Sequence, residues 1–94
     1  MNPIKKHLKQ KAHHLNPVVR TGDKGLTDAV HKEIDLALNS HELIKIKLVA
    51  ADKTARKAMI DTICEKHEAE LIQSIGHVIA IYRKSPPAEA NATA

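Results

Sequence analysis

Apolar and polar positions follow one another along this chain with two different periods, and the changes of period divide it into seven segments. Apolar residues three or four positions apart predict three helices, over residues 3–15, 26–40 and 53–67. Short apolar or β-branched runs predict four strands, over residues 17–21, 43–50, 70–75 and 78–84. The predicted order of elements is therefore α-β-α-β-α-β-β.

The same periods select the residues that should face the core. The apolar faces of the helices consist of Ile4, Leu8, Ala12 and Leu15 in the first, Leu26, Val30, Ile34, Ala37 and Leu38 in the second, and Ala55, Met59 and Ile63 in the third. In the second strand, Ile44, Ile46 and Leu48 alternate with Lys45 and Lys47, which predicts a strand with one buried face.

This order predicts an α/β fold of the two-layer α+β type. Strands joined through helices favour right-handed parallel crossovers, whereas the two-residue loop Gly76-His77 suits an antiparallel hairpin. We therefore expect a four-stranded mixed sheet with helices packed on it, formed by residues 1–84 as a single domain. Residues 85–94 are rich in Pro, Ala and polar residues, and we expect them to be a disordered tail.

Composition limits the kind of core and the location of the protein. The chain has 94 residues, of which 43% are apolar, but it has no Phe or Trp and a single tyrosine, Tyr82. Aliphatic side chains must therefore fill the core. The lone Cys64 excludes an internal disulfide, and no run of about 18 apolar residues is present to cross a membrane. These features predict a soluble, cytoplasmic protein, and nothing in the sequence demands a dimer.

Positive charge is concentrated in the first quarter of the chain. Residues 1–25 contain six Lys or Arg residues and one acidic residue, Asp23, whereas the remainder contains nine basic and ten acidic residues. Such asymmetry indicates a polyanionic partner, although a basic surface can also serve only solubility.

A glycine-bounded loop, Gly22-Asp-Lys-Gly25, lies within this basic region, between the first predicted strand and the second predicted helix. Two glycines allow a tight turn and a close approach of the backbone to another molecule. The helix predicted to follow directly would present unpaired N–H groups and the positive end of its dipole. With Arg20 and Lys24 on either side, this loop is a candidate phosphate site, although the glycines could also serve only the turn.

The chain resembles the CRM domain (chloroplast RNA splicing and ribosome maturation) in its stand-alone bacterial, YhbY-type form. The residues that carry the resemblance are Ala12-His13, Leu15, Pro17-Val-Val, Gly22-Asp-Lys-Gly25-Leu-Thr, Glu33-Ile34, Ala37-Leu38, His41-Glu-Leu-Ile-Lys-Ile-Lys47, Gln73-Ser-Ile-Gly76 and Ile81-Tyr-Arg83. Because they occur in order from about residue 8 to residue 84, they are far more specific together than any one of them alone.

This resemblance implies a fold related to the C-terminal domain of bacterial translation initiation factor three. It also implies RNA binding through Gly22, Asp23, Lys24 and Gly25, and association with precursors of the large ribosomal subunit. The loop is similar to that of the KH domain, which clamps nucleic-acid backbone. Here it joins a strand to a helix, so we expect no KH-type base-reading groove. The carboxylate of Asp23 should point away from a phosphate or cap the following turn.

Other basic residues have two readings each. The first-helix lysines are either a solvated face or, if that helix packs beside the loop, an extension of the positive surface; they are Lys5, Lys6, Lys9 and Lys11. Lys45 and Lys47 are better explained as residues on the solvent-exposed face of a sheet than as part of a binding surface. Arg83 and Lys84, at the end of the last predicted strand, are further candidates for RNA contact.

The sequence argues against several other functions. No two of the seven histidines have the i, i+4 spacing of helical metal ligands, and there is no Cys-x-x-Cys pair, so we expect no metal or other cofactor. The chain has no nucleophile elbow and no P-loop, which indicates that it is not an enzyme. Because Tyr82 is the only tyrosine and the chain has no Phe or Trp, we expect little recognition of RNA by stacking of bases on these aromatic side chains.

The sequence therefore predicts an RNA-binding protein that assists assembly of the large ribosomal subunit by contacting phosphates and RNA shape. The alternative is a protein-interaction module that docks on ribosomal proteins or on a translation factor. RNA binding predicts steep salt dependence and sensitivity to Lys24. The alternative predicts an exposed apolar patch, for which the sequence offers no clear candidate.

Overall fold

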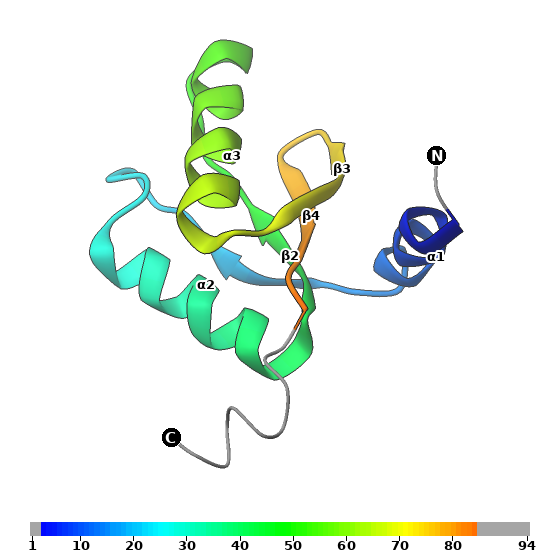
Figure 1. Cartoon of the computed structure of the whole chain (residues 1–94). Coiled ribbons are helices and arrows are strands. Elements are labelled where there is room, and N and C mark those ends of the chain that lie inside the picture. The colour runs from blue at the N-terminus through cyan, green and yellow to red at the C-terminus, as the bar shows by residue number, and fades with distance from the viewer. Residues whose placement is uncertain (1–2, 85–94) are drawn as a thin grey trace, which may run out of the picture.

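A computed structural model describes residues 3–84 of the chain, so the expected tail at 85–94 lies outside the described residues (Figure 1). Its seven elements are α1 (Pro3–Ala12), β1 (Pro17–Arg20), α2 (Asp28–His41), β2 (Leu43–Lys47), α3 (Lys53–His67), β3 (Glu70–Ile75) and β4 (Val78–Tyr82). The predicted order of elements is confirmed.

The four strands form one mixed sheet in the order β1-β2-β4-β3. β1 and β2 are parallel, because α2 carries the chain back to the same end of the sheet before β2 begins. β2 pairs with β4 and β4 with β3, both antiparallel. Gly76, with a φ of 58°, makes the tight turn between β3 and β4, as its place in the sequence predicts.

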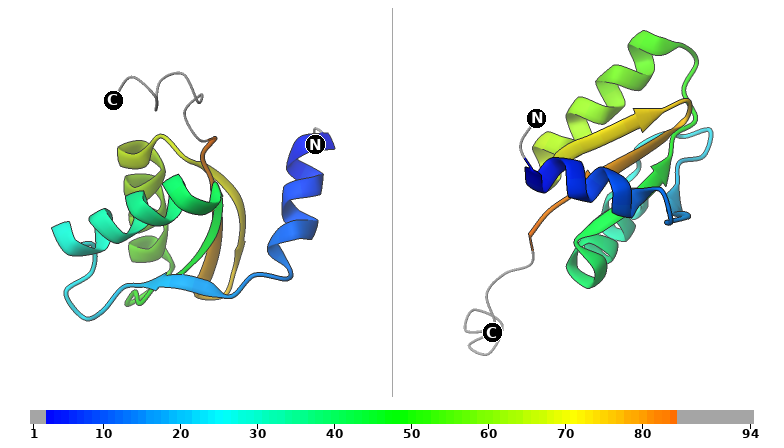
Figure 2. Two further views of the ribbon diagram at one scale, coloured as in Figure 1. Left: turned by 90° about the horizontal axis from the view of Figure 1, so that it is seen from below. Right: turned by 90° about the vertical axis from the view of Figure 1, so that its right-hand side faces the viewer.

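The helices lie on both faces of this sheet (Figure 2). α2 and α3 cover one face and enclose the main core. The buried residues of this core are Val19, Ile34, Leu38, Ile44, Ile46, Leu48, Ile60, Ile63, Ile79 and Ile81. Of the three described helices, α1 is the one on the opposite face, where it contacts β2 and β3. The two predicted layers are present, and α1 adds a partial third.

The position of α1 corrects the expectation that β2 has a single buried face. Leu43 is only 6% exposed, and it packs with Leu8 and Ala12 of α1 in a second cluster on the α1 side of the sheet. Alternation along β2 places Lys45 on this same face, where it is half-buried.

The element boundaries differ from the predicted ones by a few residues. α1 ends at Ala12 instead of residue 15, and a single turn of i to i−3 hydrogen bonds follows, in which the Leu15 N–H donates to the Ala12 carbonyl at 3.0 Å. Ile4 is 69% and Leu15 36% exposed, because only the middle of the predicted apolar face meets the sheet. β1, β2 and β4 also end earlier than predicted, at Arg20, Lys47 and Tyr82.

The two longer helices begin at side-chain caps. Asp52 caps α3, with its carboxylate accepting from the Ala55 N–H at 2.8 Å. Thr27 caps α2 by accepting from the Val30 N–H at 3.2 Å. Within residues 3–84, no helix has both the length and the apolar character that a membrane crossing needs.

Candidate nucleic-acid interface

The segment between β1 and α2 projects from the edge of the sheet as a narrow loop (Figure 1). Gly22 and Gly25 face each other as an isolated antiparallel bridge, and the Gly25 N–H donates to the Gly22 carbonyl at 3.0 Å. Asp23 and Lys24 occupy the tip of this turn, and both side chains are exposed. The loop therefore presents one lysine and one carboxylate to solvent, on a backbone that is closed by its own hydrogen bond.

The two glycines of the loop have different roles. Gly25 has a φ of 71°, a backbone conformation that an L-amino acid with a side chain rarely adopts. Gly22 has no positive φ, and a Cβ atom added to it would meet nothing within 4 Å. The turn itself thus requires a glycine at 25 but not at 22. The absence of a side chain at Gly22 leaves its backbone open to close approach by another molecule.

The base of the loop is held by Thr21, which the sequence reasoning missed. Its side chain is only 4% exposed, and its hydroxyl accepts from the Val49 N–H at 2.8 Å. Its own N–H donates to the Lys47 carbonyl at 3.0 Å. A threonine directly before the first glycine was the only signal in the sequence. These two bonds fix the direction in which the loop leaves the sheet.

The start of α2 is set back from the loop, and this corrects the prediction that the loop opens directly onto the helix. α2 begins at Asp28 rather than at residue 26, because Thr27 is its N-cap. The Thr27 hydroxyl accepts a hydrogen bond from one of the free N–H groups at the helix start, that of Val30. The Thr27 N–H donates to the Gly25 carbonyl at 3.1 Å. Two residues, Leu26 and Thr27, separate the loop from the start of α2. An anion at the loop would therefore contact the loop backbone rather than the positive end of the helix dipole.

Two further cations flank the loop on the sheet. Arg20, the last residue of β1, is exposed and pairs in register with Lys47, the last residue of β2. Their neighbours Val19 and Ile46 are buried in the main core, so Arg20 and Lys47 both project from the opposite, α1-side face. Arg20, Lys24 and Lys47 thus surround the loop with positive charge.

The first-helix lysines do not lie beside the loop. Lys5 and Lys9 are half-buried, and Lys6 and Lys11 are exposed, but α1 and the loop lie on opposite sides of the molecule in Figure 1 and in the left view of Figure 2. These lysines therefore do not extend the loop surface directly, because α1 packs across β2 and β3 instead of next to β1.

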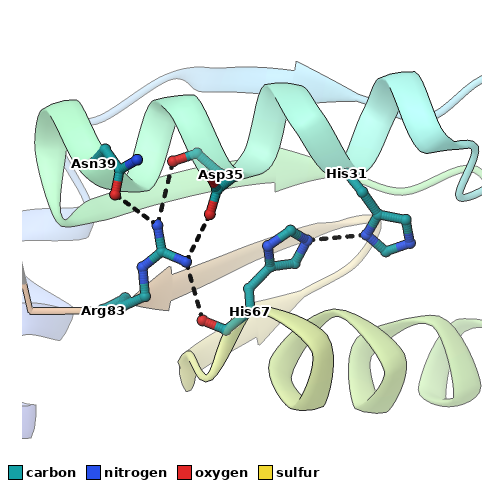
Figure 3. Close-up of polar contacts among 5 residues, drawn as sticks. All are labelled: His31, Asp35, Asn39, His67 and Arg83. Carbon is teal, nitrogen blue, oxygen red and sulfur yellow. Dashed lines mark hydrogen bonds and ion pairs between the residues drawn. The ribbon is translucent and has the colours of Figure 1, made fainter. Parts of the chain in front are cut away.

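Arg83 makes contacts inside the fold (Figure 3). Its guanidinium pairs with the Asp35 carboxylate at 3.0 Å and donates to the Asn39 side-chain oxygen at 2.9 Å and to the His67 carbonyl at 3.2 Å. It therefore links the end of β4 to both α2 and α3, and its donors are used within the protein. Lys84, the next residue, is exposed.

Two histidines form a further polar contact between α2 and α3, which sequence reasoning did not foresee (Figure 3). His31 Nδ1 lies 2.9 Å from His67 Nε2, and the two rings are tilted by 33°. Burial lowers the pKa of His67, and the neighbouring His31 lowers it further. Burial and the charge of Lys66 lower the pKa of His31, against the opposing effect of Asp28.

The described residues contain no group of three or more His, Cys, Asp or Glu side chains that could hold a metal ion. Burial and the charge of Asp61 raise the pKa of the partly buried Cys64 thiol, which keeps it in its less reactive neutral form.

Fold and loop together define a class: a small α+β domain that presents a glycine-bounded loop among cations at the edge of a mixed sheet. The chain belongs to the CRS1 / YhbY (CRM) domain family, whose model matches residues 2–83. The resemblance read from the sequence is thereby confirmed.

Similar proteins come from several bacteria. A probable RNA-binding protein of Pseudomonas aeruginosa is 44% identical over 87 residues, which cover 93% of this chain and 84% of that protein. An RNA-binding protein of Haemophilus influenzae is 47% identical over 85 residues, covering 90% and 86%. The solution structure of a Staphylococcus aureus protein, described as a candidate RNA-binding protein, has a TM-score of 0.78 at 34% identity and covers 88% of this chain and 86% of its own. These relatives are described as RNA-binding proteins and not as enzymes.

Proposed function

We propose that this protein binds RNA by holding a backbone phosphate on the loop Gly22–Gly25. The observation that carries the proposal is the open backbone at Gly22, where the fold requires no glycine, in a chain whose relatives are named RNA-binding proteins. Arg20 and Lys24 supply charge beside that phosphate, and Lys47 strengthens the field from β2. Asp23 lies at the exposed tip and directs its carboxylate away from the bound phosphate.

The remaining basic residues lie away from the loop and act at longer range on a phosphate bound there. Lys5, Lys6, Lys9 and Lys11 on α1 add to the positive potential that attracts RNA, and exposed Lys84 does the same at the end of β4. We leave Arg83 out of the RNA surface, because its guanidinium is used by Asp35, Asn39 and His67.

We further propose that the RNA is a precursor of the large ribosomal subunit, and that the protein assists assembly as a binder without turnover chemistry. The support is membership of the CRM family, whose stand-alone bacterial members the sequence resembles. This role implies a cytoplasmic location, a monomer that joins a larger particle, and ribosomal proteins as possible neighbours.

The test is the affinity of the full chain for precursor RNA of the large subunit, comparing the native protein with Lys24→Asp. Lys57→Asp is the matched control, because it makes the same charge change on an exposed lysine of α3, whose ion pair with Asp61 is a weak surface contact at 3.9 Å. We expect Lys24→Asp to weaken binding far more than Lys57→Asp. Equal affinities of the two variants would show that the loop is only a turn.

A further inference from the structure

A hollow lies on the α1 side of the sheet, at the end of β1 opposite to the loop. Its volume is about 440 Å³, within the range of about 300–1,000 Å³ that small-ligand sites occupy. Lys11 and His14 line it from the end of α1 and the following turn, Val18 from β1, His41 from the end of α2, and Lys45 from β2. It is therefore assembled from four different elements.

The lining combines an apolar floor with positive charge. Val18 is 56% and Leu15 36% exposed, so both apolar side chains are accessible in the hollow. Lys11 and Lys45 contribute positive charge, and no residue of the lining is acidic. An occupant should therefore carry negative charge next to a flat apolar surface.

The hollow is continuous with the proposed RNA surface through β1. The register of β1 against β2 shifts between Pro17 and Val19, so Val18 is placed by the hollow that it lines and not by alternation. Arg20 follows the buried Val19 and projects from the α1-side face. Val18 lines the hollow, and Arg20 lies two residues further on, at the loop end of the strand, so their Cα atoms are at most about 7 Å apart. Lys45 and Lys47 follow the same direction on β2, so cations connect the hollow to the loop.

We propose that this hollow accepts one unpaired nucleotide of the RNA whose backbone lies on the loop, an inference that rests on the proposed function. The base lies against Leu15 and Val18, beside the imidazoles of His14 and His41, and its phosphate lies near Lys45. Histidine rings can stack on bases as other aromatic rings do. The shortage of Phe, Tyr and Trp suggested that recognition rests on phosphates and RNA shape alone. With a base in the hollow, recognition includes an unpaired base as well. The protein should prefer RNA with unpaired nucleotides to a fully paired duplex.

The experiment compares the affinity of the full chain for two RNAs, measured by fluorescence anisotropy. One is a blunt hairpin, and the other is the same hairpin with a short unpaired extension. The test variant is Val18→Glu, which places a carboxylate in the hollow. Val18→Thr keeps the shape of the side chain, and Leu36→Glu adds the same carboxylate to a residue of α2 that is 62% exposed and outside the hollow.

We expect the native protein to bind the extended RNA at least about fivefold more tightly, the lower limit of what one stacked base contributes. Val18→Glu should lose this preference, whereas Val18→Thr and Leu36→Glu should keep it. His41→Ala should also reduce this preference. Because His41 lies at the end of α2, this variant leaves β1 unchanged and keeps the test available if Val18→Glu does not fold.

Other results would overturn the inference and separate it from the proposed function. If the native protein binds both RNAs equally and Lys24→Asp weakens both, the loop binds RNA and the hollow does not. If Val18→Glu and His41→Ala keep the preference, the apolar floor has another occupant, such as a protein. If neither RNA binds, the proposed function fails and the inference fails with it.

Discussion

Gly22, Thr21 and Arg83 show how differently single residues contribute to this molecule. Thr21 fixes the base of the loop through two hydrogen bonds, and Gly22 leaves the backbone open just beyond it. Arg83 was a candidate for RNA contact from its place in the sequence, yet its partners come from α2 and α3. The sequence could suggest the glycine loop because glycine spacing is local. It could not reveal the partners of Arg83, because they are 16 to 48 positions away along the chain.

At this scale the two loop glycines can be separated by substitution. Gly22→Ala should leave the free energy of unfolding within about 0.5 kcal/mol of the native value, because its added methyl group meets no protein atom. It should still weaken RNA binding, since the methyl group covers the backbone that a phosphate approaches.

Gly25→Ala is the matched control and should behave differently. Its φ of 71° should cost about 1–2 kcal/mol of stability with an alanine present. Urea unfolding and RNA titration on both variants check these expectations. If Gly22→Ala binds RNA like the native chain, no phosphate contacts that backbone.

Replacement of Arg83 should affect stability before it affects RNA. Arg83→Met removes hydrogen bonds made by a charged donor, and the loss should be about 2 kcal/mol in the free energy of unfolding. RNA affinity under conditions where the variant is folded should stay close to native. A native melting temperature combined with a large loss of RNA affinity would return Arg83 to the binding surface.

The elements differ in how much of their arrangement can be predicted. Their order follows from hydrophobic periods, and the hairpin between β3 and β4 from Gly76, because both signals are local. The placement of α1 cannot be predicted in this way, since the apolar face of a helix does not determine which side of a sheet the helix covers. The hollow depends on that placement, and so its residues could not be grouped from the sequence.

The contact between α2 and α3 should make stability depend on pH. The pKa values of His31 and His67 lie below their ordinary value of 6.5, mainly through burial, with Lys66 and Arg83 adding repulsion and Asp28 and Asp35 opposing it. The unfolded chain therefore binds more protons between the lowered values and 6.5. The stability associated with this pair is complete above pH 6.5 and is lost as the pH falls through the lowered values.

Urea unfolding at about pH 7.5 and about pH 5.5, on either side of the ordinary histidine pKa, measures this effect. The native chain should be less stable at the lower pH, and His67→Leu should show a smaller difference between the two. An equal difference in both proteins would show that other groups cause the pH dependence.

The positive charge of the molecule lies in two places. One is around the loop, beyond β1 at one edge of the sheet, and the other is α1, which packs across β2 and β3, away from the loop (Figure 2, left). A phosphate on the loop feels the near cations directly and the α1 lysines mainly through the field of the whole surface. Salt separates these contributions, because the Debye length is only about 8 Å at physiological ionic strength.

Neutralising one lysine in each place should therefore give different salt responses. At low salt, Lys6→Ala and Lys24→Ala should both weaken RNA binding. Near physiological salt, Lys6→Ala should approach the native affinity, whereas Lys24→Ala should stay weaker and lower the slope of log affinity against log salt by about 1. Identical slopes for the two variants would place both lysines in equivalent contacts.

The most direct test of RNA backbone binding at the loop is an NMR titration of the isotope-labelled chain with precursor RNA of the large subunit. The account predicts that the backbone amides of Gly22, Asp23, Lys24 and Gly25 shift first and most strongly, followed by those of β1. Shifts confined to α1, with the loop amides unchanged, would contradict it.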